Sequence, residues 1–287
     1  MGLQAAEGPY PHHCFRAANG DQLRVVPERG GLVTSWVCGG EERLYFDAER
    51  FADPAKSVRG GIPVLFPICG NLPGNRLDLP QGSYTLVQHG FARDLPWQLQ
   101  PLSDGSGIRL VLESNPQTLA AFPFAFRLSL DYRLEPSALE IVATVEHIAS
   151  SEGAMPFSLG LHPYFAVSSL PAASLEGLPE TCLDHHQMVP ASTADQLVKF
   201  SEGVDLLANP TGDAVRLADA GSGQTITLEL TAPLDLAVVW TEPPRPMVCL
   251  EPWSAPRGSL ATGDRRLELQ PGQAMQLRCR YVCSYPG

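Results

Sequence analysis

The chain has 287 residues, of which 44% are hydrophobic and 18% are charged. A chain of this length and composition can bury a large core, so disorder of the whole chain is excluded. The formal net charge of −11 repels the phosphates of nucleic acids and anionic lipids, so we exclude both nucleic acid and membrane as general partners. An anionic substrate would therefore need a few arginines that hold it locally.

Short strand-like stretches follow one another along the chain, and turns rich in glycine and proline separate them. In chain order these stretches are 32–37, 108–114, 126–134, 139–148, 226–231, 234–240, 247–253 and 275–284. The third and fourth predict a hairpin that turns at 135–138, and only 192–200 suggests a turn or two of helix. The pattern predicts an all-β protein, a large antiparallel β-sandwich that forms a single domain over 1–287.

The stretch FSLGLHPYFAV, residues 157–167, puts one titratable ring into an apolar, strand-like run. Alternation along a strand would place Phe157, Leu159 and Leu161 on one face and His162, with small or polar neighbours, on the other. The first face is typical of a core, and the second suits the wall of a pocket. The alternative interpretation is a buried histidine whose ring is satisfied by a backbone carbonyl.

Glu251 lies in the apolar stretch VCLEPW, where it would share a strand face with Cys249 and Trp253. Burial disfavours an ionised carboxylate and raises the carboxyl pKa, which makes a better base near neutrality. A surface glutamate at a strand end is the alternative. His162 and Glu251 both precede proline, which favours extended backbone. One plausible acid and one plausible base suit acid–base catalysis on a neutral molecule.

Two other segments place polar side chains beside glycines. Arg59 precedes two glycines in VRGGIPVLFPICG, and Gln88, His89 and Arg93 fall within six positions of QHGFARDLPW. Neighbouring histidines occur in PHHC and in DHHQ, but neither pair has a distant partner at zinc-like spacing, so we expect no metal site. Asp205 is typical of a solvated loop acid by composition.

The seven cysteines stand at wide spacings, and the first residues lack the features of a secretion signal. This combination favours reduced thiols and a cytoplasmic location. We expect no membrane-spanning segment, and no feature of the sequence indicates a particular oligomeric state.

The ordered blocks RGGIPVLFP, QHGFAR, LHPYF, VD and CLEPW resemble the aldose 1-epimerase (galactose mutarotase-like) superfamily, and most closely its glucose-6-phosphate 1-epimerase, or hexose-6-phosphate mutarotase, branch. The resemblance runs from about residue 15 to residue 283. It implies a large antiparallel β-sandwich, the supersandwich of that superfamily. It also implies an isomerase that interconverts the α and β anomers of a hexose 6-phosphate, foremost glucose 6-phosphate, without a metal or organic cofactor.

The resemblance implies the catalytic pair. His162 matches the family's general acid and Glu251 its general base. The base takes the proton of the anomeric hydroxyl while the acid protonates the ring oxygen. The ring then opens, the aldehyde turns about the C1–C2 bond, and closure with the roles reversed gives the other anomer.

The resemblance also implies substrate-binding residues. Arg59, Gln88 and Arg93 match residues that bind substrate in the phosphate-sugar branch, and His89 matches a position that touches sugar in the wider superfamily. Asp205 matches the substrate-binding aspartate, although two leucines follow it where the family usually has arginine and a β-branched residue. The two arginines favour a phosphorylated sugar, because a guanidinium grips phosphate through two hydrogen bonds.

Three other functions stay open beside the phosphate-sugar reading. The first is a mutarotase of free aldohexoses, and the second is a non-catalytic carbohydrate-binding sandwich. The third is a glycoside hydrolase or lyase, which needs two carboxylates around the glycosidic bond, whereas the best partner of Glu251 is a histidine. In each case the expected partner is a small sugar or sugar phosphate.

Overall fold

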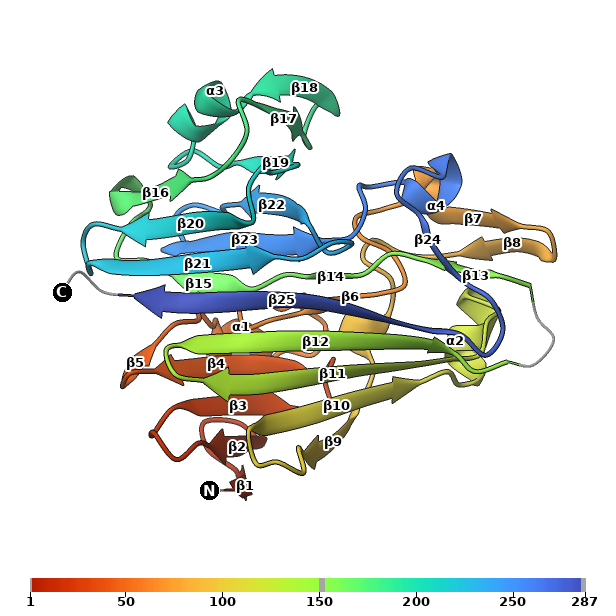
Figure 1. Cartoon of the computed structure of the whole chain (residues 1–287), viewed down its shortest axis with the longest axis horizontal. Coiled ribbons are helices and arrows are strands. Elements are labelled where there is room, and N and C mark those ends of the chain that lie inside the picture. Colours follow the sequence, from red (N-terminus) through yellow and green to blue (C-terminus); the bar gives the residue numbers. More distant parts are fainter. Residues whose placement is uncertain (1, 150–152, 285–287) are drawn as a thin grey trace.

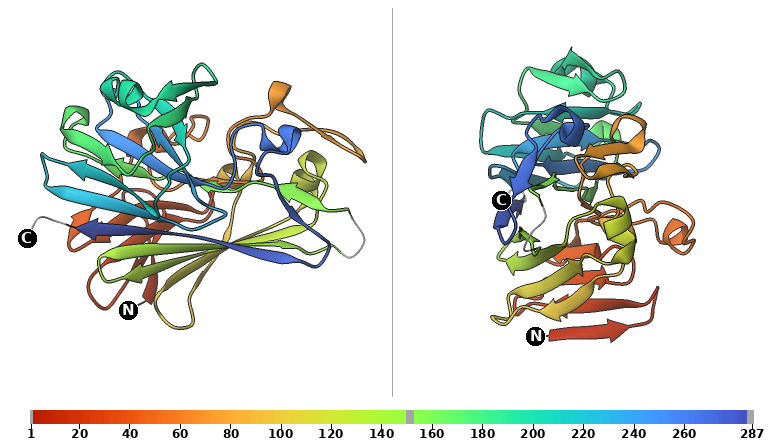
Figure 2. Two further views of the ribbon diagram at one scale, coloured as in Figure 1. Left: turned by 45° about the horizontal axis from the view of Figure 1, so that its top comes forward. Right: turned by 90° about the vertical axis from the view of Figure 1, so that its right-hand side faces the viewer.

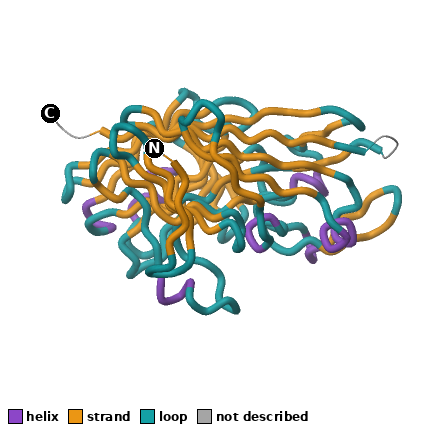
Figure 3. The backbone as a smooth tube through the Cα atoms, turned by 90° about the horizontal axis from the view of Figure 1, so that it is seen from below, coloured by secondary structure: helices purple, strands orange, loops and turns teal. Residues whose placement is uncertain are grey.

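The computed structural model describes residues 2–149 and 153–284. Its named strands all pair antiparallel, and the helices of the described part are short and lie at the margins of the molecule (Figure 3). They are α1 (Ala48–Phe51), α2 (Pro116–Ala121), α3 (Thr193–Val198) and α4 (Ser259–Thr262), with 3-10 turns η1 (Pro73–Asn75), η2 (Ala92–Asp94) and η3 (Leu170–Ala172). None of the described helices has the length and apolar character needed to cross a bilayer.

Two eight-stranded sheets and one five-stranded sheet make up most of the molecule (Figure 1). The five-stranded sheet contains, in order, β1 (Gly2–Ala6), β2 (His12–Arg16), β3 (Gln22–Val26), β4 (Leu32–Cys38) and β5 (Glu41–Glu42). The first eight-stranded sheet contains β16 (Ala173–Glu176), β20 (Ala214–Asp219), β21 (Gln224–Leu230), β25 (Ala274–Ser284), β12 (Ala138–His147), β11 (Phe126–Glu135), β10 (Gly107–Glu113) and β9 (Gln98–Pro101).

The second eight-stranded sheet carries the residues of interest. It contains β18 (Val189–Ser192), β17 (Thr181–Asp184), β19 (Asp205–Ala208), β22 (Leu236–Trp240), β23 (Met247–Trp253), β14 (Gly160–Leu161) and β6 (Val64–Leu65), and β15 (Tyr164–Ala166) also pairs with β23. Two short ribbons complete the fold, β7 (Arg76–Leu79) with β8 (Gly82–Thr85) and β13 (Met155–Phe157) with β24 (Leu267–Leu269).

The two large sheets pack face to face over an apolar core (Figure 2). The ring of Tyr281 on β25 lies 5.0 Å from that of Phe165 on β15, and its hydroxyl donates to the carbonyl of Leu250 on β23 over 2.9 Å. All three residues are buried, and the hydroxyl of the tyrosine is satisfied in the apolar interior. The predicted antiparallel sandwich is confirmed.

The predicted hairpin is also confirmed. β11 and β12 pair along their whole length, and Glu135 lies opposite Ala138 at the turn. Ser137 follows Pro136 in that turn and has a φ of 57°, the left-handed conformation found at the third position of a type II turn, where proline is common at the second position. The helix α3 lies within the predicted stretch 192–200, so local patterning located these elements correctly.

Gly160 provides a test of how closely β14 fits the sheet around it. A Cβ atom at this position would lie 2.8 Å from Trp253 Cδ1 and 3.0 Å from Cys69 Sγ, and both neighbours are buried. We expect Gly160→Ala to lower the free energy of unfolding by about 1–3 kcal/mol, because the buried indole must shift. Urea unfolding followed by tryptophan fluorescence measures this change.

Gly212→Ala is the matched control, because nothing lies within 4 Å of a Cβ placed there. Gly212→Ala should change the free energy of unfolding by no more than about 0.5 kcal/mol. An equal loss in both variants would contradict the tight fit at Gly160.

Candidate active site

The strand-like stretch around His162 does not form one continuous strand. It divides into β13, which pairs with β24, and into β14 and β15, which both pair with β23. Pro163, between β14 and β15, has no N–H to give to a ladder. The alternation of faces is nevertheless as predicted. Phe157, Leu159 and Leu161 are buried in the main core, whereas His162 lines a cleft on the other side.

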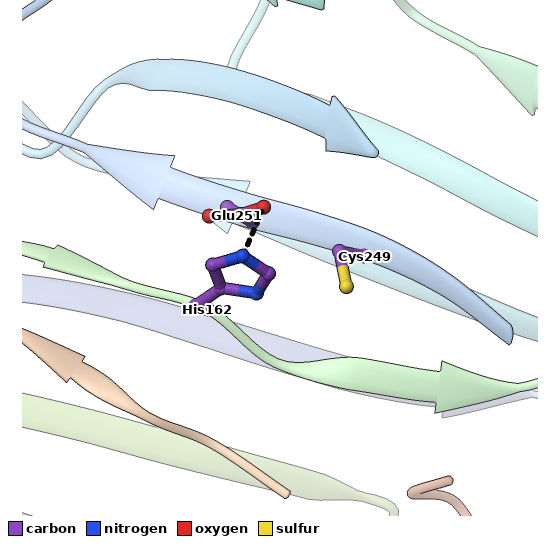
Figure 4. A group of neighbouring side chains, drawn as sticks. All are labelled: His162, Cys249 and Glu251. Atoms are coloured by element: carbon purple, nitrogen blue, oxygen red, sulfur yellow. Dashed lines mark ion pairs between the residues drawn. The ribbon is translucent and has the colours of Figure 1, made fainter. Parts of the chain in front are cut away.

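The pairing with β23 brings His162 to Glu251. Gly160 of β14 lies opposite Trp253, and β15 continues along β23 in the same register. In that register His162 stands opposite Glu251, and the two side chains face each other (Figure 4). The backbone N–H of His162 donates to the carbonyl of Pro63 over 2.9 Å, which ties the residue to the loop before β6.

The two side chains form a close, buried pair. His162 Nε2 lies 3.4 Å from Glu251 Oε1, and the side chains are 13% and 1% exposed. The indole Nε1 of Trp253 donates to the other carboxyl oxygen over 3.0 Å. His162 Nδ1 is buried and has no hydrogen-bond partner among the described residues. Glu251 also shares its face with Cys249 and Trp253, as the strand pattern predicted.

Burial shifts the pKa values of Glu251 and His162 in opposite directions, and each shift favours the neutral form of the group. It raises the pKa of the Glu251 carboxyl well above its ordinary value, and the opposing hydrogen bond from Trp253 does not compensate. It lowers the pKa of the His162 ring to about 3, and the charge of Arg93 acts in the same direction. Both shifts favour a protonated carboxyl beside a neutral imidazole, and the titration belongs to both groups together.

Aromatic rings enclose the His162 imidazole. Tyr164 stacks on it with ring centres 4.8 Å apart, Trp240 meets it edge-on at 5.7 Å, and His89 does so at 5.9 Å. These rings restrict the orientation of the imidazole and cover most of its surface. Tyr164 also keeps its proton, because burial raises the pKa of its hydroxyl well above the ordinary value.

His89 is held by the backbone as well as by its ring. Its φ of 67° is left-handed, its N–H donates to the Gly70 carbonyl over 2.6 Å, and its Nδ1 accepts from the Gly70 N–H over 3.1 Å. Burial lowers its pKa well below the ordinary value, so the neutral ring carries its proton on Nε2. That nitrogen lies 3.3 Å from the amide of Gln88.

The two predicted arginines differ in how far they are already engaged. Arg59 donates from Nε and Nη2 to both carboxylate oxygens of Glu242, over 2.8 and 3.1 Å, and this bond raises its pKa. Arg93 donates to the carbonyl of Gln88 over 2.9 Å, and the carboxylate of Asp94, itself 68% exposed, lies 3.8 Å away. Arg93 is therefore the less neutralised cation.

Asp205 is not the solvated loop acid that composition suggested. It lies on β19, its side chain is 13% exposed, and each of its carboxylate oxygens has a partner: Nδ1 of His185 at 2.8 Å and Nη2 of Arg257 at 2.8 Å. Burial alone would raise its pKa, but the bond from His185 and the charge of Arg257 hold it below the usual range. The strand pairing of β19 with β22 explains the burial.

These side chains meet in one cleft with a volume of about 290 Å³, the lower end of the range for small-molecule sites. Every site residue that the sequence predicted lines this cleft, namely Arg59, Gln88, His89, Arg93, His162, Asp205 and Glu251. Arg257 and Trp240 also line it, although the sequence did not indicate them. The sequence held a signal for Trp240, because this residue ends the apolar strand-like stretch 234–240, which precedes the strand of Glu251. No local signal distinguishes Arg257.

Cys249 lies beside the catalytic candidates, and the ligand atoms of Cys249, His162 and Glu251 fall within 4.8 Å of one another (Figure 4). A metal would need the thiolate and the carboxylate. Burial raises the pKa of the thiol well above its ordinary value, and Cys249 packs in an apolar cluster with Tyr164 and Met247. The neutral thiol is a poor ligand, so we interpret the group as an acid–base pair beside a packed thiol.

The fold and the cleft together define a β-sandwich protein with a buried histidine–glutamate pair. Residues 13–282 match the family described as Aldose 1-epimerase, so the chain belongs to this family. The Slr1438 protein from Synechocystis sp. PCC 6803 has a similar solved structure, with a TM-score of 0.90, 36% identity and 96% of each chain covered. The fold is also that of a galactose mutarotase related enzyme from Lactobacillus acidophilus, with a TM-score of 0.78, 20% identity, and 95% and 97% of the two chains covered.

A curated relative from Cenchrus ciliaris carries the name "Putative glucose-6-phosphate 1-epimerase". It is 31% identical over 159 residues, which cover 52% of this chain and 45% of the relative. The chain thus spans about half the length of such curated relatives. The predicted family and its mutarotase-like fold are confirmed.

The lowered pKa of the His162 ring leads to a prediction about its pH dependence. Because the pKa of His162 is lowered to about 3, its ring should stay neutral as the pH falls from 8 to 5, whereas an ordinary histidine gains its proton near pH 6.5. Side-chain 15N NMR spectra of the ring measure this, with N-acetylhistidine amide in the same tube as the reference.

Glu251→Gln is the informative variant for this titration. If the carboxyl already holds the proton, the substitution leaves the His162 ring signal at pH 7 in the neutral position. A signal that is protonated in the wild type at pH 7 and becomes neutral in Glu251→Gln would identify a charged pair and contradict the assignment.

Proposed function

We propose that this protein catalyses the interconversion of the α and β anomers of an aldose, with a hexose 6-phosphate, foremost glucose 6-phosphate, as the substrate. One observation carries the proposal: His162 and Glu251 face each other at 3.4 Å in a buried part of a sugar-sized cleft. Membership of the aldose 1-epimerase family agrees with this chemistry. The name of the relative from Cenchrus ciliaris supports the phosphorylated substrate.

The pair can perform both proton transfers of the reaction. The sugar hydroxyls that enter the cleft donate to Glu251 beside the Trp253 N–H, which stabilises the carboxylate and shifts the proton to His162. Glu251 then takes the proton of the anomeric hydroxyl, and His162 gives its proton to the ring oxygen as the C1–O5 bond breaks and the C1 carbonyl forms. Rotation about the C1–C2 bond and reversal of both transfers give the other anomer.

A second substrate class, free aldohexoses, is favoured by the bonds of Arg59. Its Nε and Nη2 are bound to Glu242, and its Nη1 donates to Ser57 Oγ and to the Val58 carbonyl. A phosphate would have to displace Glu242 to reach this guanidinium. Two-dimensional NMR exchange between the anomers of glucose 6-phosphate and of glucose, measured side by side, tests both classes. If neither sugar exchanges faster than its spontaneous rate, the alternative of a non-catalytic carbohydrate-binding sandwich is favoured.

The catalytic roles predict the effect of two near-isosteric substitutions. Glu251→Gln and His162→Asn should each lower kcat about 10²- to 10⁴-fold, because each removes one proton transfer. The double variant should be little slower than either single one, since the two groups act in one relay. Circular dichroism and thermal unfolding check that the fold is kept.

Glu268→Gln and His186→Asn are the matched controls, because both residues are exposed and lie outside the cleft. They should exchange sugar at the wild-type rate. Wild-type exchange by Glu251→Gln or His162→Asn at saturating sugar would show that the acid–base assignment is wrong.

The phosphate preference should depend mainly on Arg93. A charge-assisted hydrogen bond contributes about 1.5–3 kcal/mol, so Arg93→Ala should lower kcat/KM for glucose 6-phosphate about 10- to 150-fold while glucose changes little. Arg59→Ala should act in the same direction. Raised salt should weaken turnover of the phosphate sugar alone.

Arg76→Ala serves as the control, because Arg76 is exposed and pairs with Asp78 and Ser83 beside it on β7 and β8. If Arg93→Ala lowers kcat/KM by the same factor for glucose 6-phosphate and for glucose, free aldohexoses become the favoured substrate class.

A further inference from the structure

A third arginine of the cleft, Arg257, has the contacts of a residue built to meet the substrate. It follows β23 in the loop before α4, lines the cleft, and its side chain is only 17% exposed. Its aliphatic stem lies against Gly70, where a Cβ atom would be 2.2 Å from Arg257 Cγ. Only glycine leaves room for the stem there, and the left-handed φ of 69° at Gly70 suits glycine as well.

The head of Arg257 is fixed by a carboxylate that is itself fixed. Nη2 donates to Asp205 over 2.8 Å, and the second oxygen of Asp205 lies 2.8 Å from Nδ1 of His185. The His185 side chain is fully buried, and its ring lies 5.7 Å from that of Trp253, whose N–H holds the Glu251 carboxyl. The Arg257–Asp205 pair therefore has a set position relative to the acid–base pair.

The pair leaves hydrogen-bonding capacity that the protein does not use. Arg257 Nε is buried and has no partner among the described residues, and each Asp205 oxygen that takes one bond keeps a further lone pair. A buried donor without an acceptor is unfavourable until a ligand supplies one. A hydroxyl is the group that suits an adjacent donor and acceptor, because its oxygen accepts while its hydrogen donates.

An anion does not suit this part of the cleft. Asp205 neutralises Arg257, and its carboxylate would stand beside any bound phosphate, whereas among the described residues no carboxylate approaches Arg93 closer than 3.8 Å. By charge, a phosphate suits the end of the cleft at Arg93, whereas the uncharged sugar ring suits the end at Arg257.

We propose that Arg257 and Asp205 together bind one ring hydroxyl of the sugar, which makes Arg257 a substrate-contacting residue that selects among sugars by the position of that hydroxyl. The proposal rests on the proposed function for the kind of substrate, and it adds a residue and a contact that the family resemblance does not supply.

The test pairs a variant with substrates that lack single hydroxyls. Anomer exchange is measured for wild type and Arg257→Gln on glucose and on 2-deoxy-, 3-deoxy- and 4-deoxyglucose, each with and without the 6-phosphate. Arg257→Gln should lower kcat/KM about 10- to 100-fold on the parent sugar. On one deoxy sugar the wild type should fall to a similar level, and there the variant should lose nothing further.

Two further variants separate contact from structure. Arg76→Gln, at an exposed arginine outside the cleft, should match the wild type on every sugar. Arg257→Lys keeps the charge and a single donor nitrogen in place of the guanidinium fork, and it should recover part of the loss, mainly through KM. A loss by Arg257→Gln of the same factor on every deoxy sugar, or no loss on the parent sugar, would overturn the proposal.

Binding measurements keep this result distinct from a failure of the proposed function. If the wild type exchanges none of the sugars, the proposed function fails, and saturation-transfer NMR with the same sugars still tests the contact. Weaker binding by Arg257→Gln to all sugars except one deoxy sugar would support the Arg257 contact. Equal binding by both proteins, or no binding to either, would overturn it.

Discussion

The burial of the Glu251 carboxyl on β23 is the constraint on which the rest of the site depends. A carboxylate in this position would be costly without donors, so each oxygen faces one group, the Trp253 N–H and the His162 ring. The register of β14 and β15 against β23 sets this meeting. The sheet itself therefore holds the His162 ring against the Glu251 carboxyl.

The distribution of charge gives the cleft two ends of different character. The protein is strongly acidic, yet arginines gather in the cleft, and carboxylates lie close to two of them, as Glu242 does to Arg59 and Asp205 to Arg257. Such paired charges suit hydroxyl groups, since donors and acceptors lie side by side. Arg93 is only weakly compensated, so an anion meets the least opposition at that end.

The sequence predicted features that arise from local patterns and missed those set by distant neighbours. Alternation placed three apolar residues around His162 in the core, because period two belongs to any strand. The break of that stretch into separate strands depends on pairing partners far along the chain. Asp205 looked solvated because its partners His185 and Arg257 stand 20 and 52 residues away. Arg257 itself lies in an irregular loop, where no periodicity marks it.

The division between sheet and loops has a consequence for how such a protein could change over evolution. His162 and Glu251 owe their meeting to strand register, whereas Arg59 lies in the loop before β6, Arg93 in η2 and Arg257 in the loop after β23. Loops accept substitution and insertion far more readily than paired strands do. Under the proposed function, a lineage can therefore exchange the arginines of the cleft while it inherits the His162–Glu251 pair intact, and one scaffold then serves sugars of different charge.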